Sequence, residues 1–125
     1  MKFFCLILFF LMSFNLYASD WERRATGPNY VEYFGLVKKD LGIATLEMLR
    51  DYNSETDYDG ESIKSLKTLR EFDCTNRSTK VVLYKGFLEN MGEGEMLFEK
   101  KGRPQWERVD KSTFLEYAMK IACRI

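Results

Sequence analysis

Residues 69–74 read LREFDC and residues 112–125 read STFLEYAMKIACRI, and each of these stretches contains one cysteine. The chain has three cysteines, at positions 5, 74 and 123, and no histidine. Cys74 can be a nucleophile, a metal ligand or one end of a disulfide. The answer depends on the compartment in which the protein folds, because disulfides persist in oxidising compartments.

Residues 1–18 are predicted to form a cleaved secretory signal peptide. Lys2 carries a positive charge, an apolar run covers residues 3–12, and small and polar residues surround Ala18. The apolar run is too short for a membrane-spanning helix, which takes about 20 predominantly apolar residues. We therefore predict cleavage after Ala18, a single domain at residues 19–125, and no stable membrane insertion after signal removal.

Cys5 leaves with the signal peptide, so Cys74 and Cys123 are the pair that remains. An even pair in a small exported domain predicts a disulfide. Redox or metal chemistry is the alternative, but the pair has no C-x-x-C spacing and does not complete a tetrahedral site. The chain-entropy account gives such a bond roughly 4 kcal/mol, a large share of a small domain's stability.

Upstream and downstream of Cys74, the sequence predicts an antiparallel sheet. Short apolar or alternating runs separated by turn residues are typical of strands. The predicted strands cover residues 30–38, 43–52, 63–74, 80–88 and 95–100. In the second of them, Ala44, Leu46 and Met48 share one face. Residues 53–61, NSETDYDGE, are the most polar stretch, and we predict an exposed loop there.

The period of the apolar residues changes at Ser112. Apolar residues then recur at spacings of three and four, namely Phe114, Leu115, Ala118, Met119, Ile121 and Ala122. This pattern predicts an amphipathic helix with Ser112 as its N-cap and Glu116 near its first turn. Cys123 falls at the edge of the apolar face. The predicted fold class is α+β: a single antiparallel β-sheet of about five or six strands with a C-terminal α-helix packed on it and tied by a disulfide.

Composition excludes several classes of function. The chain has 19 basic and 19 acidic side chains, so nothing favours nucleic acid or an anionic membrane as a partner. The absence of histidine removes the usual general base and the commonest zinc ligand. We therefore predict no enzyme, no cofactor and no metal. A small hydrolase would need a carboxylate pair, for which Asp73, Glu93 and Glu95 are the candidates.

Two stretches resemble ligand-binding loops without completing them. Residues 55–60 alternate acidic side chains before a glycine, as a calcium loop does, but Leu66 stands where a bidentate glutamate is required. We interpret this stretch as a solvated acidic loop. Residues 91–94, MGEG, lack the third glycine of a phosphate loop, so their glycines predict a hairpin turn with positive φ.

The acidic loop nevertheless supplies the candidate binding residues. Tyr52, Asp57 and Tyr58 lie in or beside it, and tyrosine is favoured at protein interfaces. Exposed edge strands would also allow a homodimer through strand pairing.

Several landmarks occur in a fixed order along the chain. They are Trp21, Tyr30-Val31-Glu32-Tyr33, Phe72-Asp73-Cys74, Met91-Gly92-Glu93-Gly94, Trp106-Glu107-Arg108-Val109 and Ala122-Cys123. This succession resembles the surface-adhesin protein E family of Gram-negative bacteria, over nearly the whole mature chain. The resemblance implies an antiparallel sheet with a C-terminal helix held across it by the Cys74 to Cys123 disulfide.

The resemblance also implies a function. It indicates a non-enzymatic exported envelope protein, in the periplasm or on the outer-membrane surface, that binds a host matrix or serum protein or another envelope protein. The alternative is a periplasmic structural or inhibitory partner with no host contact. Two departures from the family pattern concern loops: Tyr33-Phe34-Gly35 follows Glu32 where the family has Asp and then Pro or Ser, and residues 53–60 are unusually acidic.

Overall fold

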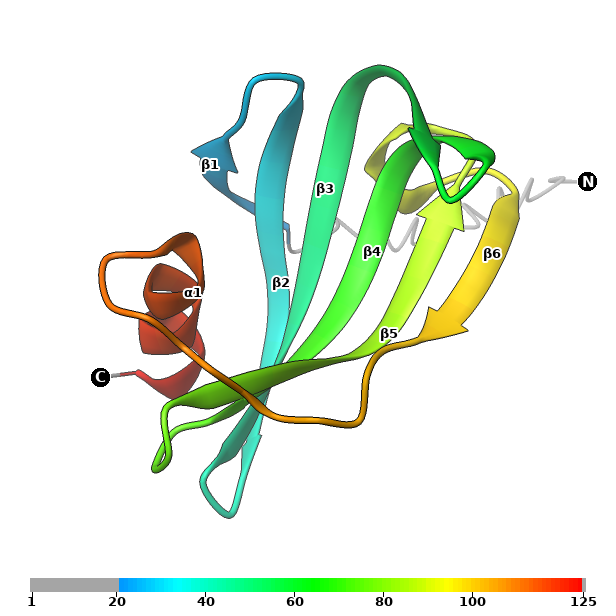
Figure 1. The fold of residues 1–125 in the computed structure, drawn as a ribbon. Coiled ribbons are helices and arrows are strands. Elements are labelled where there is room, and N and C mark those ends of the chain that lie inside the picture. Colours follow the sequence, from blue (N-terminus) through cyan, green and yellow to red (C-terminus); the bar gives the residue numbers. More distant parts are fainter. Residues whose placement is uncertain (1–20, 125) are drawn as a thin grey trace, which may run out of the picture.

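The computed structural model describes residues 21–124, so the predicted signal peptide lies outside the described residues. Seven strands form one antiparallel sheet in the order β1-β2-β3-β4-β5-β6, with β7 paired to β5 (Figure 1). The elements are β1 (Glu22–Thr26), β2 (Tyr30–Asp40), β3 (Ile43–Tyr58), β4 (Glu61–Asp73), β5 (Ser78–Phe87), a 3₁₀ turn η1 (Asn90–Gly92), β6 (Met96–Lys101), β7 (Glu107–Arg108) and α1 (Phe114–Cys123). The predicted fold class is confirmed.

The five predicted strands correspond to β2 through β6, and two short strands were missed. β1 reads ERRAT and β7 reads ER, and both are largely exposed. Neither has an apolar period, because each pairs along one edge without burying side chains in the core. Their positions are set by pairing, β1 with β2 and β7 with Ser78 and Thr79 of β5.

The predicted loop over residues 53–61 is wrong. Strand β3 continues to Tyr58, and β4 begins at Glu61, so only Asp59 and Gly60 form the turn. Both turn residues have positive φ, 50° and 85°, which is the conformation that Asp-Gly favours in two-residue hairpins. The stretch is polar because Asn53, Ser54, Glu55 and Asp57 are exposed where the hairpin projects into solvent.

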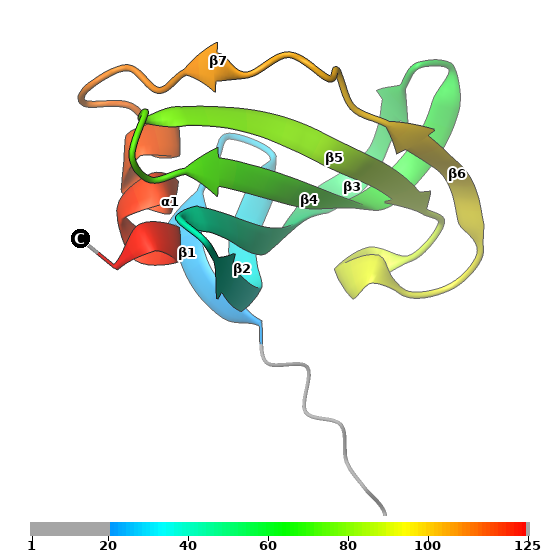
Figure 2. The same cartoon turned by 90° about the horizontal axis from the view of Figure 1, so that it is seen from below.

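Helix α1 packs on one face of the sheet, at one end of its strands (Figure 2). The core between them is apolar and almost fully buried. It consists of Phe34, Ala44, Leu46, Met48 and Phe72 from the sheet, Val109, and Ala118, Met119, Ala122 and Cys123 from the helix. The alternation predicted for Ala44, Leu46 and Met48 is therefore the face that receives the helix.

The helix begins one residue later than predicted. Thr113, not Ser112, is the N-cap, and its Oγ1 accepts a 3.2 Å hydrogen bond from the backbone N–H of Glu116. In return the carboxylate of Glu116 accepts from the backbone N–H of Ser112 at 3.2 Å. The capping-box spacing of Thr113 and Glu116 decides the register, because it satisfies two backbone donors together.

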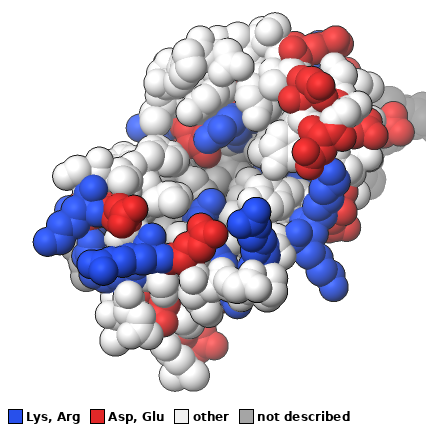
Figure 3. Space-filling model, in the orientation of Figure 1, with Lys and Arg blue, Asp and Glu red and all other residues white. Residues whose placement is uncertain are grey.

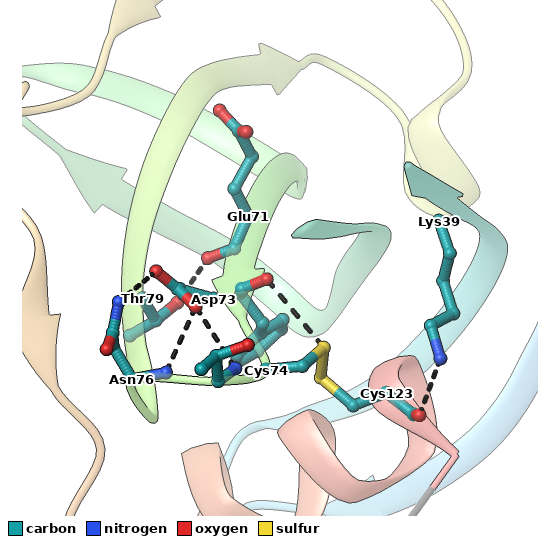
Figure 4. Close-up of a disulfide and its surroundings, with 9 residues drawn as sticks. Lys39, Glu71, Asp73, Cys74, Asn76, Thr79 and Cys123 are labelled. Atoms are coloured by element: carbon teal, nitrogen blue, oxygen red, sulfur yellow. Dashed lines mark hydrogen bonds between the residues drawn. A yellow bond between two sulfur atoms is a disulfide. The ribbon is translucent and has the colours of Figure 1, made fainter. Parts of the chain in front are cut away.

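Cys74 and Cys123 form the predicted disulfide, with their Cα atoms 5.8 Å apart and a sequence separation of 49. Figure 4 shows the bond joining the turn after β4 to the last turn of α1. Asp73 shapes that turn by accepting hydrogen bonds from the backbone N–H groups of Thr75 and Asn76 at 3.1 and 3.0 Å. The helix is thus fixed to the sheet both by its apolar face and covalently.

Candidate functional site

Helix α1 covers only part of the sheet face on which it lies, and an aromatic cluster occupies the remainder. Its buried members are Tyr52, Ile63 and Leu66, and Tyr30, Tyr58, Tyr84, Leu97 and Phe98 pack against them half-buried. The cluster is contributed by strands β2 to β6, because register places their alternate residues on this face. The open part of the sheet face is therefore lined by aromatic rings and not by the helix.

Tyr58 and Phe98 form the stacked pair of this cluster. Their ring centroids lie 5.4 Å apart with an interplanar angle of 12°, and Tyr84 lies 6.5 Å from Tyr58. Tyr58 is the last residue of β3 and Phe98 belongs to β6, so the stack bridges the β3–β4 hairpin and the far strand of the sheet. Burial raises the pKa of the Tyr58 hydroxyl, so this residue is a neutral hydrogen-bond donor at pH 7.

A buried ion pair lies next to the aromatic cluster. The Nε of Arg50 donates a 2.9 Å hydrogen bond to Glu32, whose side chain is only 5% exposed. Burial raises the pKa of Glu32, and the hydrogen bond and charge of Arg50 oppose that rise. The guanidinium of Arg50 also lies 4.0 Å from the centroid of the Tyr30 ring, a cation–π distance. The pair satisfies a carboxylate that would otherwise be costly to bury.

Arg70 is a second half-buried cation on this face. Its guanidinium donates one hydrogen bond, from Nη1 to the Oγ1 of Thr79 at 3.2 Å. Its Nε is buried and has no acceptor among the described residues. Burial lowers the pKa of Arg70 from its usual value. Unlike Arg50, this guanidinium has no carboxylate of residues 21–124 within salt-bridge distance.

Two adjoining clefts meet at Arg70, and Tyr58, Arg70 and Tyr84 line both. The helix-side cleft has a volume of about 330 Å³ and reaches Glu32, Arg50 and the helix residue Leu115. The strap-side cleft has a volume of about 380 Å³. One of its walls is the strap, the segment of residues 102–107 that follows β6. Figure 3 shows this face hollowed, with acidic side chains gathered over the β3–β4 hairpin and lysine and arginine below it.

The wall of the strap-side cleft depends on a close backbone contact. The N–H of Gly102 donates to the carbonyl of Val82 at 3.1 Å, and a Cβ at this glycine would overlap the carbonyl oxygen of Val81. A register shift between Leu69 and Arg70 places an extra residue of β5 at the same point. Such bulges re-aim side chains next to binding sites, and here the bulge lies beside Arg70.

Basic side chains predominate around the strap-side cleft. Besides Arg70, the basic lining residues are Lys80, Lys100, Lys101 and Arg103, and the acidic ones are Asp59 and Glu107. Lys100 forms an exposed 3.1 Å ion pair with Asp59, and Lys80 lies 4.6 Å from the Trp106 ring centroid. The cleft therefore has an excess of positive charge in a chain whose formal net charge is zero.

The structure separates the three predicted binding residues. Tyr58 lines both clefts. Tyr52 is only 6% exposed and packs edge-on against Tyr30 at 6.2 Å, so it supports the face from beneath. Asp57 lies exposed at the hairpin end, where its Oδ1 accepts from the N–H of Gly60 at 2.9 Å. Sequence reasoning missed Arg50, Arg70, Tyr84 and Phe98. A signal was available for Arg70: it lies two residues before Phe72 in a strand, so both side chains are on the same face of the sheet.

The other sequence motifs do not add a site. Asp73 precedes β5 whereas Glu93 and Glu95 follow it, so the three carboxylates of the hydrolase hypothesis lie at opposite ends of that strand. The MGEG stretch is the predicted turn, with φ of 69° at Gly92 and 76° at Gly94. Within residues 21–124, no three potential metal-ligating side chains converge on one point.

The fold and its clefts define a class of protein: a small single-sheet module whose disulfide-tied helix leaves part of one sheet face uncovered. The chain belongs to the surface-adhesin protein E family, which it matches over residues 21–124. The predicted family is confirmed. No curated protein matches the chain by sequence.

Solved structures of Haemophilus influenzae protein E have the same fold. Crystal form II of that protein superposes with a TM-score of 0.68 at 19% sequence identity, covering 85% of this chain and 88% of that chain. A second structure of the protein gives a TM-score of 0.65 at 18% identity, covering 85% of each chain. At this identity the likeness establishes the shared fold.

Family membership implies a surface-adhesin-like protein that is exported or exposed in the cell envelope. None of the helices in the described range has the length and apolar character needed to cross a bilayer.

Proposed function

We propose that the mature protein is a non-enzymatic adhesin on the surface of a Gram-negative cell and binds a host matrix or serum protein through the open half of its sheet face. The observation that supports this proposal most directly is the aromatic and basic lining of that half. Tyr58, Tyr84 and Arg70 border both clefts. Tyrosine and arginine are the residues that most often dominate the binding energy of protein interfaces.

The arrangement of the face also supports a protein ligand. The stacked ring of Tyr58 is held by Phe98, so little conformational entropy is lost when a ligand packs on it. Asp57 lines neither cleft, and its Oδ1 accepts from Gly60, so we assign it at most a rim contact with a ligand that extends over the exposed hairpin end. Tyr52 contributes from beneath by supporting Tyr30, whose ring carries the guanidinium of Arg50.

The proposal is tested by binding of the protein, purified after export with its own leader, to immobilised laminin, fibronectin, collagen and vitronectin. The wild type is compared with Tyr58→Ala and with Leu41→Ala. Leu41 is the matched control because it is 97% exposed and belongs to the β2–β3 turn, away from both clefts. We expect saturable binding to at least one protein, weakened tenfold or more by Tyr58→Ala and unchanged by Leu41→Ala.

Absence of binding to every matrix and serum protein would contradict the proposal. A partner captured instead from periplasmic extract, with the same dependence on Tyr58, would favour the alternative function, a periplasmic structural or inhibitory partner. The two outcomes differ in the source of the ligand and not in the site.

A further inference from the structure

We propose that the strap-side cleft is a binding site for an oxyanion, a carboxylate, sulfate or phosphate group, which the guanidinium of Arg70 receives at the meeting point of the two clefts. The ligand is one that presents one acidic group to Arg70 and a further acidic group to the lysine and arginine side chains at the mouth. The inference does not depend on the proposed adhesin function, because it concerns small anions and the purified protein alone.

The first argument is the unfilled bonding capacity of Arg70. A guanidinium has five N–H donors in a planar fork, and the structure assigns an acceptor to one donor of Arg70, the Nη1–H that meets Thr79. Its Nε is buried without an acceptor in the described part of the chain. A buried unsatisfied donor is costly, more so when it is charged. That Nε has almost no solvent-accessible surface, so an oxyanion in the cleft would instead bind the Nη2–H donors of Arg70, which have no acceptor among residues 21–124 and are not enclosed.

Comparison with the other half-buried arginines makes Arg70 distinctive. Arg50 is paired with Glu32 at 2.9 Å, and Arg77 with Glu116 at 2.6 Å. Arg24 also has a buried Nε without an acceptor in the described range, but it forms an ion pair with Glu22. Each of those guanidinium groups is neutralised by a carboxylate of the fold itself. Arg70 is buried to a similar degree and lacks such a partner among residues 21–124, so its charge is available to a ligand.

The second argument is the charge of the cleft walls. Four further basic side chains, Lys80, Lys100, Lys101 and Arg103, line the cleft with two acidic ones, Asp59 and Glu107. A concave surface lined by one sign of charge focuses the field and raises the local concentration of the opposite ion. The volume of about 380 Å³ admits a ligand with several acidic groups.

The third argument is that the cleft is rigid. Its wall is fixed where Gly102 meets the backbone of Val81, with no room for a side chain at the glycine. Thr79, which orients Arg70, is 1% exposed and donates its own hydroxyl hydrogen to the carbonyl of Glu71 at 2.8 Å. The guanidinium is therefore held in place before a ligand arrives, which lowers the entropic cost of binding.

The test follows the Arg70 Nε–H by ¹H–¹⁵N NMR while sulfate, phosphate or citrate is added to the protein in chloride buffer of constant ionic strength. We expect a saturable shift of the Arg70 resonance, with citrate binding more tightly than sulfate or phosphate if the ligand is a polycarboxylate. In Arg70→Gln, affinity followed by backbone amide shifts of Val81 and Gly102 should fall at least tenfold, because a charge-assisted hydrogen bond is lost.

Lys38→Gln is the matched control, because Lys38 is exposed on β2 and lines neither cleft. Its affinity should stay within twofold of the wild type. If Arg70→Gln does not fold, the double variant Lys100→Gln with Arg103→Gln tests the proposal in its place. We expect this double variant to bind the anion several-fold more weakly than the wild type. Unsaturable shifts spread over all lysine and arginine residues, or an unchanged affinity in Arg70→Gln or in the double variant, would overturn the proposal.

Discussion

The ring of Tyr58 stacks on that of Phe98 with centroids 5.4 Å apart, and this contact joins the end of β3 to β6 across the open sheet face. Offset aromatic stacking adds about 0.5–1.5 kcal/mol beyond the area that is buried. The stack therefore fixes the β3–β4 hairpin against the sheet as well as lining the clefts.

We expect Phe98→Ala to cost about 1–3 kcal/mol in the free energy of unfolding, because Phe98 is half-buried and a cavity replaces its ring. Hydrogen exchange of the amides at residues 57–61 should accelerate, since the hairpin loses its support. Met96→Ala on the same strand is the control, because Met96 is 46% exposed. Equal exchange rates in the two variants would show that the stack does not hold the hairpin.

Replacement of Arg50 by methionine should produce a pH-dependent loss of stability. The folded state already raises the pKa of Glu32 by burial, so it holds that proton more tightly than the unfolded chain. Stability is then lost as the pH rises from the ordinary value of 4.5 through the folded pKa of Glu32. Without Arg50 the pKa rises further, and the loss grows.

For Arg50→Met we expect a deficit of about 2 kcal/mol against the wild type at pH 7, moderated because Arg50 is 37% exposed. The deficit should shrink at pH 4.5, where Glu32 is protonated in the variant. Urea unfolding at the two pH values measures it, with Arg50→Lys as a control that keeps the charge. A deficit that is the same at both pH values would contradict this prediction, because it would mean that Glu32 in the folded variant stays neutral or stays solvated across this range.

The disulfide predicts non-additive mutations. Cys74→Ala and Cys123→Ala should each lower the free energy of unfolding by about 2–4 kcal/mol, because either one frees the same 49-residue loop. The double variant should cost little more than either single variant. Urea unfolding of the wild type and the three variants completes a double-mutant cycle. Clearly additive losses would show that the two side chains stabilise the fold separately.

Gly102→Ala tests how the strap-side cleft is built. A methyl group there overlaps the carbonyl oxygen of Val81, which belongs to the backbone of β5 and cannot rotate away. We expect a loss of about 1–3 kcal/mol, together with altered NMR shifts around Arg70. Gly60→Ala is the comparison, because no atom lies within 4 Å of its added methyl group, so it carries only the cost of its φ of +85°, whereas Gly102 has no positive φ and carries only the overlap. If Gly60→Ala costs as much as Gly102→Ala, the close contact does not constrain the wall.

The elements that were predictable from sequence are those in which burial of one face produces a regular pattern of apolar residues. Apolar residues alternate in β3 because one face receives the helix, and they recur at three and four in α1 for the same reason. The disulfide followed from the number of cysteines in an exported chain. The hairpin end beyond Tyr52 was missed because most of its side chains are polar and exposed and show no apolar alternation, although Asp59-Gly60 was a usable hairpin signal.

The site was only partly predictable. Tyr58 was chosen for its exposed, aromatic character, and it does line the clefts. Arg70 was not identified, because its role depends on where the helix stops covering the sheet and on the contact of Gly102 with β5, which join segments far apart in sequence. Local patterns place a side chain on a face, but they do not tell which part of that face stays open.

The measurement that tests the proposed function most directly is protease treatment of intact cells, followed by detection of this protein and of a known periplasmic control. A surface adhesin must be reachable from outside, so we predict that this protein is cleaved while the control stays intact. If it survives until the outer membrane is permeabilised and is then cleaved, it lies in the periplasm, and the adhesin function is contradicted.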